Sequence, residues 1–434
     1  MKRNYIHKTL DVFRDTAYLS IPGKGWIQRR ADQSMSMVQG QGKTPSTDTE
    51  KFFSEVAKDK YIPDRTPYVR ESRRVVLKLG TKVLLKHKKG ESGALHGLAR
   101  DIVRFRERGY VFSIVTSGAV GFGMDAMGIE ARPTDLKKIQ ALASIGQSLL
   151  MQNWNAIFAE SGLHTSQILL TYDIIENRKR YLHARDCFRS VFEYGAVPIV
   201  NENDSVAVDE LKFGDNDTLS ALTAILTDAD LLVLFTDTDG IHTRNPYRHG
   251  DAERIPFIEQ VDESVFGLIE DKQNGLSLGG MRSKLLAAQR SAQMGTGVII
   301  TQGFEPDLAA LLEGADLGTF IRPNHKYEKK RKRWIFFNHK MKGRVIVDRG
   351  AEDALVNHSG SLLPGGILGT EGVFERESIV GIYNTADTLI GKGITNYASA
   401  EIEQMKGRRT DQLKSESGAV FADEVIHRDN MIVI

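Results

Sequence analysis

Two lysines stand where a lysine side chain can meet a phosphate group. Lys78 lies at the end of a short apolar run and is followed by Gly80, which allows a tight backbone turn. Lys284 lies in the stretch Gly279–Leu285, where two glycines open a predicted helix whose first N–H groups attract anions. Two fixed cations beside such anion sites suit phosphoryl transfer, in which the protein mainly positions the reactants and stabilises charge.

The stretch between Asn201 and Asp217 is rich in carboxylates and amides. It holds six acidic residues, three asparagines and one lysine, Lys212, within 17 residues. Oxygen ligands at this density suit a hard cation such as Mg²⁺, and they also suit the ammonium group of an amino acid. Asp215 and Asp217 flank Asn216, so these carboxylates can orient lysines. A polar surface loop is the alternative interpretation, but the stretch lies between an apolar run and a predicted helix.

Two further segments place polar groups directly after apolar runs. Thr116–Gly123 is built from small residues that let a ligand approach the backbone closely. Its Ser117 has no histidine partner in the nearby motifs, so a hydrogen bond to a substrate carboxylate fits better than a nucleophilic role. Thr236–Ile241 follows the most apolar run and suits a nucleotide base or ribose. Taken singly, each segment also fits an ordinary turn after a strand.

The elements that must position these groups alternate between short apolar runs and helical patterns. Runs that are apolar at consecutive positions indicate strands buried on both faces, and alternation with helices indicates a mostly parallel sheet. We therefore predict an α/β fold, an αβα sandwich, whose ligands bind beyond the carboxyl ends of the strands. The predicted strands are Val75–Leu79, Val111–Val115, Ala196–Val200, Leu231–Phe235 and Gly297–Thr301, and the predicted helices include Leu136–Phe158, Lys179–Tyr194 and Thr218–Leu226.

The pattern changes around Pro323–Arg333. Short, glycine-punctuated strands follow and predict a small, mainly-β C-terminal domain. These strands are expected at Gly343–Asp348, Gly365–Ile367, Gly372–Phe374, Ser378–Tyr383 and Asp387–Lys392. We accordingly divide the chain into a mostly irregular N-terminal extension (1–72), an α/β domain (73–325), and a linker with the β domain (326–434).

Composition bounds the function classes. The chain has 434 residues and one cysteine, Cys187, which excludes a disulfide framework and a cysteine-ligated zinc site. The sequence contains no run of about 18 apolar residues, so we expect no membrane span. A single cysteine fits a reducing compartment, so we expect a cytoplasmic protein. The first 30 residues hold seven basic residues against Asp11 and Asp15, which is a poor match to an organelle transit peptide.

One segment is strongly basic. Lys326–Arg349 holds ten basic residues against two acids, Glu328 and Asp348. A solvated linker between domains is the favoured interpretation, and a nucleic-acid patch or targeting signal is the alternative.

The motifs occur in an order that resembles the amino acid kinase family, and in particular its glutamate 5-kinases. The C-terminal part resembles the PUA domain, a small module of the RNA-binding type, and the two resemblances together cover residues 73–434. The kinase motifs are Lys78–Thr81, Thr116–Ala119, Asn201–Asp204, Gly214–Asp217, Leu234–Asp237 and Gly279–Lys284, and the PUA motifs are Gly343–Ala351, Ser361–Ile367 and Gly391–Asn396.

This resemblance implies roles for individual residues. Lys78 and Lys284 would contact the transferring phosphoryl group, and Asp217 would position them, with Lys212 and Asp215 in the same loop. The implied glutamate ligands are Ser117, Asp204 and Asn216. The implied ATP ligands are Lys78, Thr236, Asp237, Leu278, Gly279, Gly280, Met281, Arg282, Ser283 and Lys284. Leu278 is a departure, because the family usually has threonine there, which puts a hydroxyl contact to the nucleotide in doubt.

The resemblance further implies a reaction and its partners. ATP, with Mg²⁺ bridging its phosphates, would phosphorylate the γ-carboxylate of L-glutamate to L-glutamyl 5-phosphate, the first step of proline biosynthesis. Feedback inhibition by proline, a homo-oligomer and RNA contact through the PUA-like domain are also implied. The alternatives are a sibling kinase that acts on aspartate, acetylglutamate, carbamate or UMP, or a protein whose main activity is RNA binding or modification.

Overall fold

The structure is a computed structural model. It describes the backbone of residues 16–21 and 25–30, and residues 64–81, 83–84, 93–171, 173–207, 216–269, 280–324, 335, 341–358, 360–409 and 423–433. In the segment expected to be mostly irregular, β1 (Thr16–Ile21) and β2 (Gly25–Arg30) pair as an antiparallel hairpin. A short helix, α2 (Thr66–Glu71), precedes the expected start of the α/β domain.

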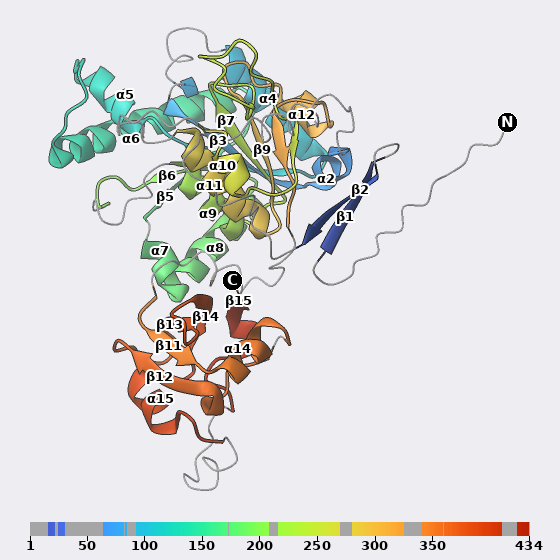
Figure 1. The fold of residues 1–434 in the computed structure, drawn as a ribbon. Helices are drawn as coiled ribbons and strands as arrows, with labels where there is room; N and C mark the ends of the chain where they lie inside the picture. The colour runs from blue at the N-terminus through green and yellow to red at the C-terminus, as the bar shows by residue number, and fades with distance from the viewer. Residues whose placement is uncertain are drawn as a thin grey trace. The chain divides into compact units, whose positions relative to one another are not determined.

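An eight-stranded sheet forms the centre of the α/β domain (Figure 1). Its strands follow the order β5-β6-β4-β3-β7-β9-β10-β8. All neighbours pair in parallel except β9 and β10, which confirms the predicted mostly parallel sheet. The strands are β3 (Arg74–Leu79), β4 (Val111–Thr116), β5 (Thr165–Leu170), β6 (Val197–Glu202), β7 (Leu231–Thr236), β8 (Phe257–Ile258), β9 (Gly297–Gln302) and β10 (Thr319–Ile321).

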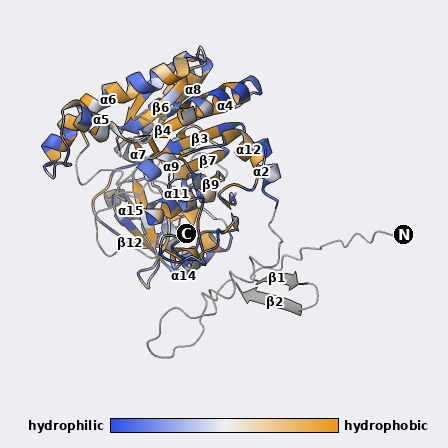
Figure 2. Cartoon of the chain, turned by 90° about the horizontal axis from the view of Figure 1, so that it is seen from above, coloured by the Kyte–Doolittle hydropathy of each residue, from blue (hydrophilic) through white to orange (hydrophobic). Residues whose placement is uncertain are grey.

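Helices cover both faces of this sheet. On β3, Val75 and Leu77 belong to an apolar cluster with residues of α4 and α6, whereas Val76 belongs to a second cluster with α8, α9 and α11. The αβα sandwich is therefore confirmed. The helices α4, α6 and α8 carry both polar and apolar residues along their length (Figure 2), as expected for helices with one buried face. The helices are α4 (Gly93–Glu107), α5 (Ala119–Ala126), α6 (Leu136–Ala159), α7 (Asp173–Glu176), α8 (Arg178–Glu193), α9 (Asn216–Leu226), α10 (Glu263–Phe266), α11 (Met281–Gln293) and α12 (Leu308–Leu312).

The C-terminal part forms its own five-stranded sheet in the order β12-β11-β13-β14-β15. Two expected strands were wrong. Gly365–Ile367 is not a strand, because its two glycines lie in the 3-10 helix that follows Leu363 and only Ile367 belongs to β12. Gly372–Phe374 is not one either: β12 ends at Glu371, and Gly372 has φ +85°, so the chain turns there and carries Phe374 into the local core. The elements are β11 (Arg344–Val347), α14 (Arg349–Val356), η3 (Pro364–Gly366), β12 (Ile367–Glu371), β13 (Ile379–Tyr383), β14 (Leu389–Ile394), α15 (Ser399–Met405), η4 (Arg428–Asn430) and β15 (Met431–Val433).

Within the described part of the chain, none of the helices combines the length and apolar character that a membrane span requires.

Candidate active site

The predicted polar residues gather at the carboxyl edge of the parallel sheet. Lys78 is the second-to-last residue of β3, and in the sheet register it lies between Val115 of β4 and Leu234 of β7. Thr116 ends β4 and Thr236 ends β7. Because parallel strands all end at the same edge, residues far apart in the sequence become neighbours there.

A buried carboxylate joins the two lysines. Asp217, in the first turn of α9, is fully buried. Its Oδ1 lies 2.6 Å from Nζ of Lys78, and its Oδ2 lies 3.1 Å from Nζ of Lys284. Both lysines are themselves only 5% exposed. Three elements that are distant in sequence, β3, α9 and α11, are therefore held together by one charged cluster.

The carboxyl group of Asp217 keeps its negative charge in this environment. Burial pushes its pKa up, but Lys78 and Lys284, together with hydrogen bonds from Lys78 and Ser283, outweigh burial and hold the pKa below its ordinary value. A buried charge is tolerated only when it is paired and hydrogen-bonded, and Asp217 meets both conditions.

The start of α11 supplies two of the contacts to Asp217. Helix α11 begins after Gly280, and its first turn carries Ser283 and Lys284. The Ser283 hydroxyl is 2.8 Å from Oδ2 of Asp217 and 2.9 Å from the carbonyl oxygen of Gly280. Arg282 points elsewhere, since its guanidinium lies 5.4 Å from the ring centroid of Phe266 in α10. Ser283, predicted only as an ATP ligand, thus also contacts the lysine-binding carboxylate.

Asn216, the residue before Asp217, faces the second glycine-rich segment. Its amide nitrogen lies 2.5 Å from the carbonyl oxygen of Thr116, 2.8 Å from Oγ of Ser117 and 3.0 Å from Oδ1 of Asn201. Ser117 and Asn216, both predicted to hold substrate, are therefore direct neighbours. Adjacent residues at the start of α9 serve two different sides of the site.

Gln147 extends this amide network and was missed by the sequence analysis. Its Oε1 accepts a hydrogen bond of 2.8 Å from Nδ2 of Asn201. The preceding residue, Gly146, explains the close approach of α6: a Cβ there would lie 1.8 Å from the carbonyl oxygen of Ala119 in α5. No motif marks Gln147, because one polar residue in a long amphipathic helix gives no signal.

The remaining predicted ligands that the structure describes lie after β6, at and after the end of β7, and at the start of α11. Asp204 lies in the turn that follows β6, where the N–H of Ala207 bonds back to the carbonyl of Asn203. The hydroxyl of Thr236 lies 3.2 Å from Oδ1 of Asp237, at the end of β7. Met281 opens α11 beside Gly280. Four predicted residues lie outside the described residues: Lys212, Asp215, Leu278 and Gly279.

The described residues offer no cage for a metal ion. Among them, no group of three or more His, Cys, Asp or Glu side chains is placed to hold one. The nearest carboxylate to both lysines, Asp217, is already engaged by them.

Comparisons with known proteins show what this chain is similar to. Residues 73–302 match the model of the amino acid kinase family, and residues 343–416 match that of the PUA domain. The chain is 38% identical to a glutamate 5-kinase of Syntrophotalea carbinolica, over 85% of this chain and 99% of that protein. It is 40% identical to one of Moorella thermoacetica, over 84% and 97% respectively. A solved structure of isopentenyl phosphate kinase aligns with 20% identity and a TM-score of 0.39, over 57% of this chain and 99% of that one.

We expect Asp217→Asn to destabilise the protein strongly, because it removes the charge that compensates two buried lysines. Breaking a buried ion pair by removing one partner typically costs about 3–5 kcal/mol. The measurement is the free energy of unfolding by urea titration. Since the folded-state pKa of Asp217 is lowered, its contribution is complete at neutral pH. The difference from the wild type should shrink only as the pH falls below about 4.

The matched control for this variant is Asp251→Asn. Asp251 pairs with Arg244 at 3.5 Å, but its side chain is 72% exposed. A surface pair contributes about 0–1 kcal/mol, so this variant should unfold close to the wild type. Equal losses in the two variants would show that the cluster around Asp217 is not a buried charge network.

Proposed function

The chain belongs to the amino acid kinase family and, within it, to the glutamate 5-kinases, and from this membership we propose how its residues perform the reaction. It transfers a phosphoryl group from ATP to the γ-carboxylate of L-glutamate and so forms L-glutamyl 5-phosphate, the first step of proline biosynthesis. The observation that carries the residue-level proposal is the buried triad of Lys78, Asp217 and Lys284 at the sheet edge.

The acceptor group explains why the site needs no general base. A glutamate side chain has an ordinary pKa of about 4.3, so its carboxylate is already a deprotonated nucleophile at neutral pH. The obstacle is that two anions, the carboxylate and the triphosphate, must approach each other. Catalysis then depends on positioning and on cations that screen the repulsion.

We assign that screening to the two lysines. Lys78 comes from the sheet and Lys284 from the first turn of α11, so they can grip a phosphoryl group from two directions. Asp217 fixes both ammonium groups before substrate arrives, at 2.6 Å and 3.1 Å. Because the cluster is buried, the lysines act in a medium of low dielectric, where they stabilise negative charge more strongly than in water.

The amide network is our proposed glutamate site. Asn216 and Ser117 are hydrogen-bonded to each other, and Asn201 supports Asn216 from the neighbouring strand. Asp204, in the turn after β6, supplies a carboxylate for the ammonium group of the amino acid. The proposal therefore puts glutamate on the Asn216 side of α9.

ATP is proposed to occupy the other side of α9. Thr236 ends the apolar strand β7, and Asp237 follows it. At the start of α11, Gly280, Met281 and Arg282 precede the Ser283–Lys284 pair. Mg²⁺ would be held chiefly by the ATP phosphates and water rather than by a protein cage. When bound, it supplies further positive charge to the triphosphate.

We expect Lys78→Ala to lower kcat by about a hundredfold or more, as the loss of one charge-stabilising donor commonly does. The assay follows ADP release with L-glutamate, ATP and Mg²⁺. Lys138→Ala, which removes an exposed lysine on α6, is the control and should keep normal kcat. Near-normal kcat in Lys78→Ala would refute its role.

Parallel assays with aspartate, acetylglutamate, carbamate and UMP test the sibling activities. Turnover of one of these compounds without turnover of L-glutamate would refute L-glutamate as the acceptor.

Proline is proposed to compete with glutamate near Asp204 and Asn216, because both molecules carry an α-amino acid head. Titrating proline at several glutamate concentrations should raise the apparent KM for glutamate and leave kcat unchanged. A fall in kcat with an unchanged KM would place the proline site elsewhere.

The C-terminal domain is a PUA domain, an RNA-binding fold, and we propose that the chain contacts RNA through it. The basic run Lys326–Arg349 supports this by its charge. RNA retention by the full chain should weaken steeply as salt rises, and no retention at low salt would refute the contact. We also propose that the chain forms a homo-oligomer, which a measurement of its mass in solution would test. The single cysteine, Cys187, supports a cytoplasmic location.

A further inference from the structure

Helix α2 lies before the stretch that matches the family model, yet it is packed onto the kinase domain. The family match begins at residue 73, whereas α2 ends at Glu71. Val69 of α2 is fully buried, and the ring of Tyr68 lies 5.7 Å from that of Phe320 in β10. Helix α2 therefore has a defined packing position beside β10.

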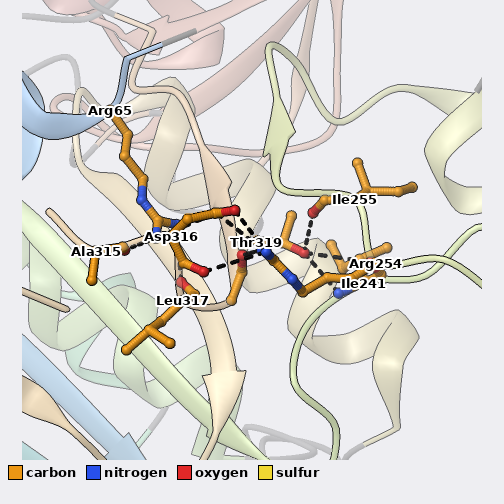
Figure 3. A network of polar contacts seen from close by, with 9 residues as sticks. Arg65, Ile241, Arg254, Ile255, Ala315, Asp316, Leu317 and Thr319 are labelled. Atoms are coloured by element: carbon orange, nitrogen blue, oxygen red, sulfur yellow. Dashed lines mark hydrogen bonds and ion pairs between the residues drawn. The ribbon is translucent and has the colours of Figure 1, made fainter. Parts of the chain in front are cut away.

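Arg65, just before α2, reaches from this position into the turn that leads to β10 (Figure 3). Its side chain is only 5% exposed. One guanidinium nitrogen donates to the carbonyl of Leu317 at 2.9 Å, and the other donates to the carbonyl of Ala315 and lies 3.6 Å from the carboxylate of Asp316. One arginine thus satisfies two backbone carbonyls and one charge in a three-residue stretch.

A second arginine holds the same turn from the opposite side. Arg254 pairs with Asp316 at 2.9 Å and also donates to the carbonyls of Asp316, at 3.3 Å, and Gly318. Successive carbonyls of the turn therefore alternate between the two arginines: those of residues 315 and 317 face Arg65, and those of 316 and 318 face Arg254. Asp316 is shared by both guanidinium groups.

The next residue, Thr319, ties the turn to the loop between β7 and β8. Its buried hydroxyl accepts a hydrogen bond of 2.8 Å from the N–H of Ile241 and donates one of 2.6 Å to the carbonyl of Ile255. These two residues lie on the outgoing and returning arms of the loop, which also bond to each other. A Cβ at Gly240 would lie 2.7 Å from the Thr319 hydroxyl, so the backbone at Gly240 packs closely against Thr319.

The loop held in this way begins directly after the proposed nucleotide ligands. Thr236 ends β7 and Asp237 follows it, and the hydroxyl of Tyr247, farther along the loop, donates to the carbonyl of Asp237 at 3.0 Å. A displacement of this loop at Ile241 and Ile255 would therefore change the position of Asp237. Arg65 contacts the turn, Thr319 at the end of the turn contacts Ile241, and Ile241 lies four residues along the chain from Asp237.

We propose that Arg65 is a positioning residue for ATP binding: from the segment that precedes the family domain, it holds the 315–319 turn and thereby the loop that carries Asp237. The proposal rests on the ATP site assigned above. Without Arg65, the carbonyl of Leu317 loses its arginine donor, the carbonyl of Ala315 keeps only the N–H of Leu317, and Asp316 keeps Arg254. The turn can then shift toward Arg254 and carry Thr319 with it. Hydrogen bonds from a charged donor are stronger than neutral ones, so losing them on one side gives the turn a reason to move.

The test compares Arg65→Ala and Arg65→Lys with the wild-type full chain. We expect Arg65→Ala to raise the KM for ATP, and the Kd of a non-hydrolysable ATP analogue measured by calorimetry, by about five- to tenfold, as loss of roughly one charged hydrogen bond would. The KM for glutamate should change by less than about twofold, because the amide network lies on other elements. Arg65→Lys should recover part of the ATP affinity, since it keeps the charge for Asp316 but cannot reach both carbonyls.

Arg70→Ala is the matched control. Arg70 is an exposed residue on α2 that donates to the carbonyl of Glu313 at 3.2 Å. It therefore also joins the helix to the domain, but this hydrogen bond does not go to the 315–319 turn. It should leave both KM values unchanged. If Arg65→Ala fails to fold, Asp316→Asn, which removes the shared charge and keeps the carbonyls, should raise the ATP KM in the same direction.

Two results would overturn the proposal. A lowered midpoint of thermal unfolding in the Arg65 variants with an unchanged ATP KM and analogue Kd would make Arg65 purely structural. Equal increases in both substrate KM values would show a general loss of the site. Failure of the proposed function is a separate outcome: it would show as wild-type protein that releases no ADP with L-glutamate, whereas the analogue Kd is measured without glutamate.

Discussion

The buried carboxylate of Asp217 is the interaction on which the active site depends. Counted over Lys78, Asp217 and Lys284 alone, the cluster carries two positive charges and one negative charge, nearly hidden from water. Burial makes such charges expensive, so the lysines depend on the carboxylate that pairs with both of them. The same carboxylate that stabilises the two lysines therefore also holds them at the sheet edge, where we propose that they meet the phosphates of ATP.

The fold explains how one short helix can contact both proposed substrate sites. Helix α9 is buried along nearly its whole length between the sheet and its neighbouring helices, so its first turn has little freedom to move. Asn216 points to the ends of β4 and β6, and Asp217 points to β3 and α11. Because the two residues are adjacent, the distance between the proposed glutamate side and the proposed phosphoryl side is set by one peptide unit rather than by packing between domains.

Much of the architecture could be predicted because buried parallel strands are apolar on consecutive positions. That signal located β3, β4, β6, β7 and β9 to within two residues and placed Lys78 at a strand end. It failed for β5, an edge strand whose Thr165–Leu170 sequence mixes polar and apolar residues and is mostly half-exposed. It also failed for β8 and β10, which have two and three residues, too few for any periodicity.

Within the site, residues were predictable where their chemical type and neighbours were distinctive. Asp217 lies in a dense acidic stretch, whereas Gln147 is one amide on a 24-residue helix and is recruited only because Gly146 lets α6 approach α5. Arg65 is harder still, since its partners lie about 250 residues away and two of them are backbone carbonyls. Every residue has a carbonyl, so an arginine directed at carbonyls leaves no complementary pattern in the sequence. Contacts of this kind let a segment outside the family motifs adjust a site whose motifs stay intact, and they are found only where the chain's geometry brings the carbonyls together.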